Sequence, residues 1–393
     1  MDYSNVTLVI PSHNNLRHLK NVYTSIRKFY KDVEVILLDD CSTDGTWDWV
    51  TSIKDENLVK YTTNKQLGHT ILYDVGIDMA KGDVVGILHA DMIIGPNYLE
   101  NLLKHLDKGK VVCATRIEPP LHPEGDEKII QDFGMDFDTL DIDGFEDFAR
   151  QHQRTYQDTT TRGMFAPWIL YKEDFQRIGG HDPLFHPFPY EDSDIFQRWI
   201  LQGYELIQSR DSFVYHLTCR GHRWTEEIGK NDDYFPIVEE RARWNYIRKW
   251  GSWIKNDNYQ HPIIPPVYKK ALHLQNGTPE LLKVLEPWFT SISTDLPTTQ
   301  LSSFIKETQP KTMFDLTDKF KVEAIEDIVV HIDGSKFDQQ DFQNLQNLNY
   351  IIQQSGEDGG KFMLDNLNIT ILKIKDTVND LINIPYERTS KIY

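Results

Sequence analysis

The clearest indication of the fold is the stretch VEVILLDDCSTDGT, which occupies residues 33–46. Residues 33–38 are mostly apolar and end at two aspartates, so they predict a short buried strand. Residues 42–45 then supply cap and turn residues ahead of a helix that carries Trp47 and Val50. This stretch therefore predicts a strand, a turn and a helix in succession.

The same alternation continues on both sides of this stretch. Before it, residues 6–10 are apolar, and residues 16–29 carry apolar side chains at helical spacing. Alternating strands and helices predict an α/β fold with a mainly parallel sheet covered by helices on both faces. In such a sheet, ligands bind beyond the carboxyl ends of the strands. The elements expected after it are a weak strand at 58–61, a helix over 70–80, a strand at 84–88, a helix over 96–106 and a strand at 111–115.

A change of character follows in the middle of the chain. Residues 121–150 contain ten acidic residues against two basic ones and have no clear period. We expect a surface excursion there, and its carboxylates favour a solvated face over a calcium or acceptor site. A helix is expected over residues 234–250. The proline-rich segment 255–266 then predicts a domain boundary, because paired prolines fit neither a helix nor a central strand.

Two domains are expected from a chain of 393 residues. The first spans residues 1–254. The second, residues 267–393, has the pattern of a smaller α/β or α+β unit. No group of carboxylates or histidines follows a strand in the second domain, so acceptor recognition or formation of a homo-oligomer is favoured there over a second catalytic site.

The composition excludes several classes of protein. A net charge of −18 opposes binding to nucleic acid, because that affinity comes largely from Lys and Arg. Three widely spaced cysteines fit neither a disulfide framework nor a CxxC zinc site, and they indicate a reducing compartment. No segment is apolar over the length of a membrane span, and the first residues lack the basic start of a signal peptide. We expect a soluble, cytoplasmic protein, with peripheral attachment to a membrane left open.

Two polar segments at predicted strand ends suit a nucleotide. Pro11, Ser12 and Asn14 follow the first strand, where small and polar residues can admit a base and offer backbone groups to it. Asp40 follows the second strand, and its carboxylate can accept a hydrogen bond from a uracil N3–H or a ribose hydroxyl. For Asp44, which precedes a helix, capping is the favoured interpretation.

The segment HAD, residues 89–91, follows another predicted strand. A nucleoside diphosphate leaving group gains negative charge as its bond to a sugar breaks, and a divalent cation held by a carboxylate stabilises that charge. Asp91 lies where this carboxylate is needed, and hard oxygen ligands suit Mg²⁺ or Mn²⁺. His216 follows an apolar strand and is the candidate nitrogen ligand, with His222 as its rival.

The segment YEDSD, residues 190–194, places adjacent carboxylates at the expected start of a helix. Neighbouring carboxylates shift one another's pKa values and can leave one of them poised as a base. Deprotonation of an acceptor hydroxyl requires such a base, and one of these carboxylates is the candidate.

Taken in order, these motifs resemble those of family 2 glycosyltransferases with the GT-A fold. The resemblance covers roughly residues 1–250 and is carried by PSHN, VEVILLDDCSTDGT, NKQLG, GDVVGILHADMII and FQRIGGHDPLFHPFPYEDSDIFQRW. It implies an inverting, metal-dependent transfer with Mn²⁺ or Mg²⁺ as cofactor. It also implies a nucleotide-sugar donor, with a UDP-sugar as first choice, and a glycan or glycoconjugate as the acceptor.

The resemblance assigns roles only where residues match. Asp40 matches the acidic residue that holds the nucleotide base, and Asp91 matches the last carboxylate of the family's metal-binding Asp-x-Asp element. Asp192 matches the catalytic base, and His216 resembles the downstream metal ligand. The other implied site residues are Pro11, Ser12, Asn14, Lys65, Gly68 and Ala90 on the donor nucleotide and Glu191 and His181 on the acceptor side.

Two positions depart from the family pattern. His89 replaces the first Asp of the metal motif, where a histidine can ligate a metal, donate a hydrogen bond to the donor phosphates, or do neither. His181 stands where the family commonly has Phe, which alters the acceptor side.

Two rival functions stay open. A sugar nucleotidyltransferase would carry a Gly-rich, Arg-containing loop after the first strand, and PSHNN is not such a loop. A degenerate sugar-nucleotide-binding protein without catalysis would account for His89. The retention of Asp91, Asp192 and His216 favours an enzyme.

Overall fold

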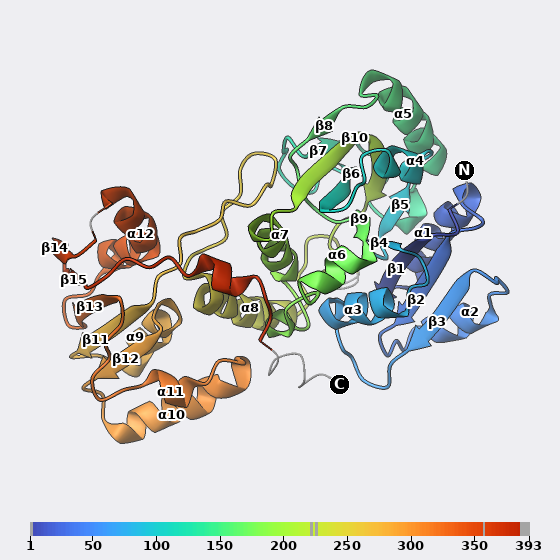
Figure 1. Ribbon diagram of the computed structural model, residues 1–393. Coiled ribbons are helices and arrows are strands. Elements are labelled where there is room, and N and C mark those ends of the chain that lie inside the picture. Colours follow the sequence, from blue (N-terminus) through green and yellow to red (C-terminus); the bar gives the residue numbers. More distant parts are fainter. Residues whose placement is uncertain (1–2, 221–222, 225–226, 357, 386–393) are drawn as a thin grey trace. The chain divides into compact units, whose positions relative to one another are not determined.

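The computed structural model describes residues 3–220, 223–224, 227–356 and 358–385 (Figure 1). The chain forms two compact units. Unit 1 comprises Met1–Val238 with Asn256–Pro262, and unit 2 comprises Glu239–Lys255 with Ile263–Tyr393. The sequence assigns residues 239–254 to the first domain, whereas the structure groups them with unit 2. The reason is that Ile247 packs in the apolar core of unit 2.

Unit 1 is built on a ten-stranded mixed sheet whose main path runs β3-β2-β1-β4-β9-β6-β10-β5. The pairs β3-β2, β2-β1, β1-β4 and β6-β10 are parallel, while β9 and β5 pair with their neighbours in antiparallel fashion. The expected α/β fold with a mainly parallel sheet is confirmed. The strands are β1 (Val6–Ser12), β2 (Glu34–Asp39), β3 (Leu58–Thr62), β4 (Val84–Ile87), β5 (Met92–Ile94), β6 (Lys110–Glu118), β7 (Lys128–Ile130), β8 (Thr160–Thr161), β9 (Trp168–Tyr171) and β10 (Glu205–His216).

The helices of unit 1 place their apolar faces in its core. In α1, for example, Leu19, Val22 and Ile26 are fully buried, at the spacing of one helix face. Figure 1 shows these helices around the sheet. They are α1 (Leu16–Phe29), α2 (Thr46–Ser52), α3 (His69–Met79), α4 (Tyr98–Leu103), α5 (Ile142–Thr155), α6 (Lys172–Arg177) and α7 (Glu191–Leu201), with short 3₁₀ turns at Phe137–Thr139 and Pro183–Phe185.

The acidic segment 121–150 is more ordered than its sequence suggests. It includes β7 and most of α5, and Phe145 and Ala149 of that helix are buried against Phe213 and Tyr215 of β10. The lack of a clear period in this sequence therefore does not mean that the segment lacks secondary structure. The segment has ten acidic residues, and the few apolar residues that pack α5 against the sheet are difficult to recognise among them.

The parallel register brings the predicted motifs to one edge of the sheet. Ser12 at the end of β1 pairs with Asp39 at the end of β2, which pairs with Thr62 at the end of β3. The loops that follow these strands therefore leave the sheet at the same edge, which is where a ligand is expected to bind.

Unit 2 contains a five-stranded sheet in the order β12-β11-β13-β15-β14. The strands β11, β12 and β13 are parallel, and β15 and β14 are antiparallel to their neighbours. The strands are β11 (Lys270–Gln275), β12 (Ser291–Thr294), β13 (Ile328–Asp333), β14 (Gly360–Leu364) and β15 (Leu367–Ile371). The helices are α8 (Phe235–Trp250), which begins in unit 1, α9 (Pro279–Leu285), α10 (Thr298–Thr308), α11 (Leu316–Lys319) and α12 (Gln339–Ser355), with 3₁₀ turns at Glu286–Trp288, Gln309–Lys311 and Val378–Leu381.

The expected second, smaller domain with both helices and strands is present. Its core combines Trp288, Leu272, Val330 and Leu348 from its sheet and helices, all nearly inaccessible to solvent. Within the part of the chain that the structure describes, none of the helices combines the length and apolar character needed to cross a membrane.

Candidate functional site

Three predicted residues meet where β4 and β10 end. His89 and Asp91 lie between β4 and β5, and His216 is the last residue of β10. Since Met92 pairs with His216 across β5 and β10, Asp91 stands beside the end of that strand. One donor atom from each of the three residues lies within 4.8 Å of the other two, and Asp91 Oδ1 is 3.6 Å from His216 Nε2. Two imidazole nitrogens and a carboxylate oxygen therefore converge on a space the size of one metal ion.

His216 is held in place by a second carboxylate that the sequence did not single out. Its Nδ1–H donates a hydrogen bond of 2.9 Å to Glu118 Oε1, at the end of β6. That bond leaves Nε2, on the side of Asp91, as the nitrogen with a free lone pair. Histidines that bind metals usually make such a bond through their other nitrogen, because it fixes the tautomer and the ring orientation.

The surroundings of Glu118 favour its ionised form, which accepts the hydrogen bond from His216. Arg116 Nη1 lies 2.8 Å from Glu118 Oε1, and Lys128 Nζ lies 3.0 Å from Oε2. Burial raises the pKa of Glu118, but the hydrogen bond from His216 and the charges of Arg116 and Lys128 outweigh it. The pKa of Glu118 is therefore held well below its usual range.

Asp91 presents one of its two oxygens to the cluster. The other, Oδ2, accepts a hydrogen bond of 3.1 Å from the backbone N–H of Arg220. The side chain is 4% exposed, so its orientation is fixed by its surroundings. His222, the rival ligand, lies outside the described residues.

Asp40 organises the loop that follows β3. Its Oδ1 accepts a hydrogen bond of 2.7 Å from Leu67 N, and its Oδ2 accepts one of 2.8 Å from Gly68 N. Thr63 Oγ1 adds a third bond at 3.2 Å. The predicted contact of Asp40 with a nucleotide base stays a prediction. The buried Asp40 carboxylate, which follows β2, fixes the backbone of the NKQLG loop through these hydrogen bonds.

Gly68 explains how this loop meets the segment before α7. It has φ +75°, and a Cβ atom there would lie 2.3 Å from Pro187 Cβ, so only glycine fits. The next residues continue the contact, because Thr70 Oγ1 donates a hydrogen bond of 2.8 Å to Pro187 O. The start of α3 is therefore fastened to the segment that leads into Glu191 and Asp192.

This junction brings His69 against Glu191. His69 Nε2 lies 2.7 Å from Glu191 Oε1, and the His69 ring stacks on Phe188 at a centroid distance of 5.3 Å. Burial lowers the pKa of His69, but the negative charge of Glu191 and the hydrogen bond between them raise it above its usual value. Burial raises the pKa of Glu191, but the charge of His69 and the hydrogen bond between the two side chains lower it below its usual value. The structure thus forms a partly buried ion pair at the start of α7.

Asp192 has the opposite electrostatic surroundings. Burial, with the negative charge of the neighbouring Glu191, raises the pKa of Asp192 to about 7. The side chain is half-buried, so it also faces the solvent. A carboxylate with a pKa near neutrality accepts a proton far more readily than an ordinary aspartate, which is what a general base requires.

Tyr73 lies between the metal-type cluster and the carboxylates of α7. Its ring centroid is 6.5 Å from that of His89, 5.6 Å from that of His69 and 5.8 Å from that of His181. His89 in turn is 5.7 Å from His216. A continuous row of aromatic and imidazole rings therefore connects the end of β10 to the start of α7.

Burial and the acidic side chains on both sides of Tyr73 affect the pKa of its hydroxyl group. Burial raises the pKa of Tyr73 well above its usual value. The negative charges of Asp192, Glu191 and Asp91 act in the same direction, so all three carboxylates lie within electrostatic reach of this phenol. Asp91 and Asp192, far apart in sequence, are therefore both near Tyr73.

His181 is more enclosed than an acceptor contact would suggest. Its side chain is fully buried, and its Nδ1 lies 2.6 Å from Asp74 Oδ1 on α3. Burial raises the pKa of Asp74 above its usual value, although the charge of His181 and its hydrogen bonds to Asp74 act in the opposite direction. The assignments of His181 and Glu191 to the acceptor side stay predictions. Both residues are shown as the buried partners of α3 side chains.

The remaining predicted nucleotide residues surround the ends of β1 and β3. Asn14 Oδ1 accepts a hydrogen bond of 2.7 Å from Thr43 N, which joins the first two loops. Ser12 is buried, and its hydroxyl has no partner among the described residues. Lys65 is exposed on the NKQLG loop. Pro11 is buried in β1, and Ala90 separates the two cluster residues His89 and Asp91.

Three residues of this site were not found from the sequence. Glu118 ends a strand that was expected to finish at residue 115, while His69 and Tyr73 lie on a helix with a mostly apolar sequence. The position of Glu118 at a strand end was a usable signal. The roles of His69 and Tyr73 depend on the junction at Gly68 and could not be read from their neighbours in the sequence.

Two family models and several known proteins match parts of this chain. Residues 7–177 match the family model described as glycosyl transferase family 2, and residues 149–220 match the one described as the N-terminal domain of galactosyltransferase. The chain is 27% identical over 230 residues to validoxylamine A glucosyltransferase of Streptomyces hygroscopicus subsp. jinggangensis, which covers 53% of this chain and 54% of that protein.

A second relative and one solved structure are also similar. The chain is 27% identical over 107 residues to UDP-Glc:alpha-D-GlcNAc-diphosphoundecaprenol beta-1,3-glucosyltransferase WfaP of Escherichia coli, covering 27% of this chain and 43% of that protein. The chain therefore spans about half the length, or less, of these relatives. A crystal structure of GalNAc-T7 with UDP, GalNAc and Mn²⁺ aligns with a TM-score of 0.43 and 16% identity over 63% of this chain and 50% of that chain.

Proposed function

We propose that this protein transfers a sugar from a nucleoside diphosphate sugar to a hydroxyl group of a glycan or glycoconjugate, because residues 7–177 match the family model described as glycosyl transferase family 2. A UDP-sugar is the donor proposed first. The observation that carries the proposal is the site around Tyr73, where an aspartate with a raised pKa and a metal-type cluster lie on either side of one buried ring.

The proposed reaction is a single displacement with inversion at the anomeric carbon. Asp192 removes the proton from the acceptor hydroxyl as its oxygen attacks the anomeric carbon, and the bond from that carbon to the diphosphate oxygen breaks. The bonding electrons leave with the nucleoside diphosphate. His69 holds Glu191 in its ionised form, and the negative charge of Glu191 helps to raise the pKa of Asp192, which makes Asp192 the more basic of the two adjacent carboxylates.

The residues present fit a divalent cation. His89, Asp91 and His216 would hold it, and Glu118 would keep His216 in the required orientation. When bound, such an ion supplies positive charge that stabilises the diphosphate leaving group. Imidazole nitrogens suit transition metals better than they suit Mg²⁺, so Mn²⁺ is proposed over Mg²⁺.

The donor nucleotide is proposed to bind over the ends of β1, β2 and β3. Ser12 offers a buried hydroxyl without a partner among the described residues, and Asp40 shapes the backbone of the adjacent loop. Lys65 on the same loop is exposed and can approach a phosphate. A role of unit 2 in acceptor recognition or in a homo-oligomer, and a cytoplasmic location, also stay proposals.

The test is metal-dependent release of nucleotide from a panel of UDP-, GDP- and dTDP-sugars, measured with Mn²⁺, Mg²⁺ or EDTA. We expect slow release from one nucleotide class, loss of release with EDTA and in Asp91→Ala, and strong reduction in Asp192→Asn. Asp48→Asn, which changes an exposed carboxylate on α2, is the matched control and should behave as wild type. No release from any donor, together with no thermal shift from any nucleotide plus Mn²⁺, would favour the degenerate binding protein that His89 suggests.

A further inference from the structure

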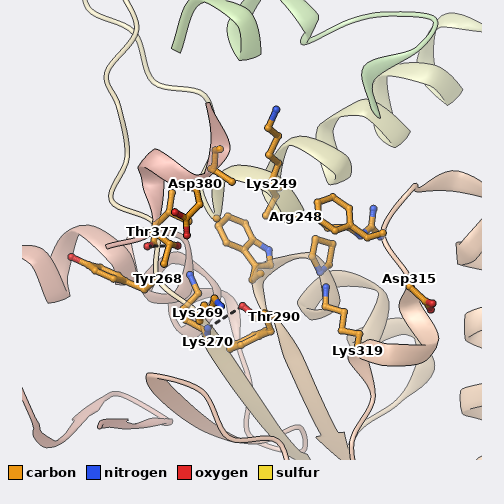
Figure 2. A pocket seen from close by; sticks show the side chains of 18 of the residues that line it. Arg248, Lys249, Tyr268, Lys269, Lys270, Thr290, Asp315, Lys319, Thr377 and Asp380 are labelled. Atoms are coloured by element: carbon orange, nitrogen blue, oxygen red, sulfur yellow. Dashed lines mark hydrogen bonds between the residues drawn. The ribbon is translucent and has the colours of Figure 1, made fainter. Parts of the chain in front are cut away.

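Unit 2 contains a cavity of about 410 Å³ that the proposed transfer reaction does not use. The cavity is bordered by the end of α8, the start of β11, the residue before β12 and the chain around Val378–Leu381 (Figure 2). Its size falls within the range of roughly 300–1,000 Å³ that is common for small-molecule sites. It also lies at the amino ends of β11 and β12 rather than at their carboxyl ends, so its position does not follow the usual rule for α/β sheets.

Lys270 is the unusual residue of this cavity. It is 1% exposed, and its Nζ donates to Asn349 Oδ1. The Asn349 amide is itself fixed, because its Nδ2 donates to Pro266 O at 2.9 Å and to Gly251 O at 3.4 Å. The Asn349 oxygen therefore faces the lysine, and one of the three Nζ donors has a neutral acceptor. Among the described residues, no carboxylate lies within ion-pair distance of Lys270.

Other buried cations of the same unit do have a carboxylate. Glu286 is fully buried and accepts hydrogen bonds from Arg248 at 2.6 Å and from Lys319 at 2.5 Å. Both cations also line the cavity, so Glu286 neutralises two of its positive charges but not that of Lys270. Burying an ammonium group without an opposite charge is costly, which suggests that something outside the described chain supplies that charge.

The carboxylates that line the cavity do not take this role. Asp315 accepts hydrogen bonds from the backbone N–H groups of Thr317 and Asp318 at the start of α11. Burial is the sole cause that lowers the pKa of Lys270 to about 7, with no contribution from Asp380 or any other acidic group. An anion bound beside the amine would restore its charge.

The rest of the lining is suited to an apolar body with hydrogen-bond acceptors. Val267, Tyr268, Phe289 and Leu381 contribute apolar surface. Trp288 is 2% exposed, and its indole N–H has no acceptor among the described residues. In Figure 2, the side chains of the labelled lining residues gather around the hollow, and Lys249 extends away from the others.

We propose that this cavity binds a small organic anion, in which a carboxylate or phosphate is attached to a ring or short apolar chain and faces Lys270. The fixed ammonium group, the indole N–H and the apolar walls then each have a partner of matching chemistry. The site is separate from the glycosyl transfer chemistry and does not depend on it.

The first test is chemical labelling of the intact protein with pyridoxal 5′-phosphate, which combines a ring, a phosphate and an aldehyde. Lys270 Nζ attacks the aldehyde carbon, water leaves, and borohydride reduces the resulting imine to a stable secondary amine that peptide mapping detects. At pH 7 we expect at least tenfold more label on Lys270 than on Lys361, an exposed lysine of β14, because only Lys270 lies beside a cavity that can hold the ring and phosphate of the reagent. Label on Lys270 no higher than on Lys361 would overturn the proposal.

A competing ligand and a Lys270 variant distinguish binding in the cavity from a high chemical reactivity of the Lys270 amine alone. Pyridoxine 5′-phosphate lacks the aldehyde, so it should reduce the label on Lys270 and raise the melting temperature of the wild type. The thermal shift should vanish in Lys270→Met and persist in Lys361→Met, while nucleotide release from a sugar donor stays unchanged in both. If pyridoxine 5′-phosphate neither protects Lys270 nor shifts the melting temperature, the cavity is not an anion site. Since wild-type labelling needs no variant, this conclusion holds even if Lys270→Met fails to fold.

Discussion

His69 Nε2 lies 2.7 Å from Glu191 Oε1, so a histidine at the start of α3 neutralises the carboxylate directly before the candidate base Asp192. The junction that makes this contact depends on Gly68, which passes under Pro187 where no side chain could fit. The protonation of Asp192 is therefore coupled to a residue more than one hundred positions away in the sequence.

Replacing His69 with Phe should shift the pH dependence of catalysis. Phe keeps the stack on Phe188 but removes a positive charge from the group that His69 forms with Glu191 and Asp192. The two carboxylates then hold a proton more tightly, so the acidic limb of kcat/KM should move to higher pH by roughly one unit or more. Phe188→Leu loosens the stack without changing the charge, and its pH profile should stay in place. Equal profiles for His69→Phe and the wild type would remove His69 from this role.

Asp192→Asn should lower kcat by roughly 10²–10⁴ while nucleotide binding is retained, because this is the usual contribution of a general base. In the wild type, activity should fall as the pH drops through about 7, where Asp192 becomes protonated. Rates from pH 5 to 9 and a nucleotide titration measure both effects. A variant with near-normal kcat would identify another group as the base.

The same substitution should change stability in a pH-dependent way. The folded protein binds the Asp192 proton more tightly than the unfolded chain does, because the pKa rises from an ordinary value near 4 to about 7 on folding. Wild-type stability should therefore decrease as the pH rises between these values, and Asp192→Asn should lack that decrease. We expect the variant to have the higher melting temperature at pH 8, with the difference shrinking toward pH 4. A difference that stays constant with pH would contradict the raised pKa.

The sequence predicted the residue ranges of five strands of the ten-stranded sheet and the edge of the sheet at which the polar residues gather. The strand expected at 33–38 is β2, Glu34–Asp39, and the helix expected over 70–80 is α3, His69–Met79. Both carry strong periodic or continuous apolar patterns, and polar residues follow directly at the strand ends. Such local signals are sufficient to place Asp40 and Asp91 at the same edge of a sheet.

The parts that were missed depend on contacts between distant segments. Trp168–Tyr171 enters the sheet as the antiparallel strand β9 between β4 and β6, which no local pattern specifies. Glu118 becomes important because β6 and β10 run side by side, which brings it to His216. Candidate residues could thus be read from motifs, whereas the residues that orient them required the tertiary structure.

Glu118→Gln should weaken metal binding by roughly 10–100-fold, the usual effect of removing a residue that orients a metal-binding histidine. Calorimetric titration with Mn²⁺ measures this change. Glu127→Gln is a close control, because Glu127 Oε1 contacts Arg116 Nη2 at 3.1 Å but makes no hydrogen bond to His216. Its Mn²⁺ affinity should stay near that of the wild type. If the two variants lose the same affinity, the effect comes from Arg116 rather than from the orientation of His216.

Glu286→Gln should destabilise unit 2. The wild-type carboxylate is fully buried and neutralises Arg248 and Lys319, and its removal leaves both cations buried without an opposite charge. Breaking a buried pair in this way typically costs about 3–5 kcal/mol. Burial raises the pKa of Glu286, but the two cations lower it to about 2, so the stabilisation should be present at neutral pH and be lost as the pH falls from about 4 toward 2. Urea unfolding at pH 7 and pH 3 measures both effects. Glu280→Gln, at an exposed position on α9, should have little effect.

His89→Asp should change the metal preference of the site. The wild-type cluster offers two imidazoles and one carboxylate, a donor set that favours Mn²⁺ over Mg²⁺, whereas a second carboxylate provides the oxygen ligands that Mg²⁺ prefers. The ratio of nucleotide release with Mn²⁺ to release with Mg²⁺ should therefore fall by roughly tenfold in the variant. His331→Asp, at an exposed position on β13, makes the same chemical change away from the cluster and should leave the ratio unchanged. An unchanged ratio in His89→Asp would mean that His89 is not a ligand, and a calorimetric titration with Mn²⁺ would then show equal affinity in both proteins, because Asp91 and His216 alone would hold the ion.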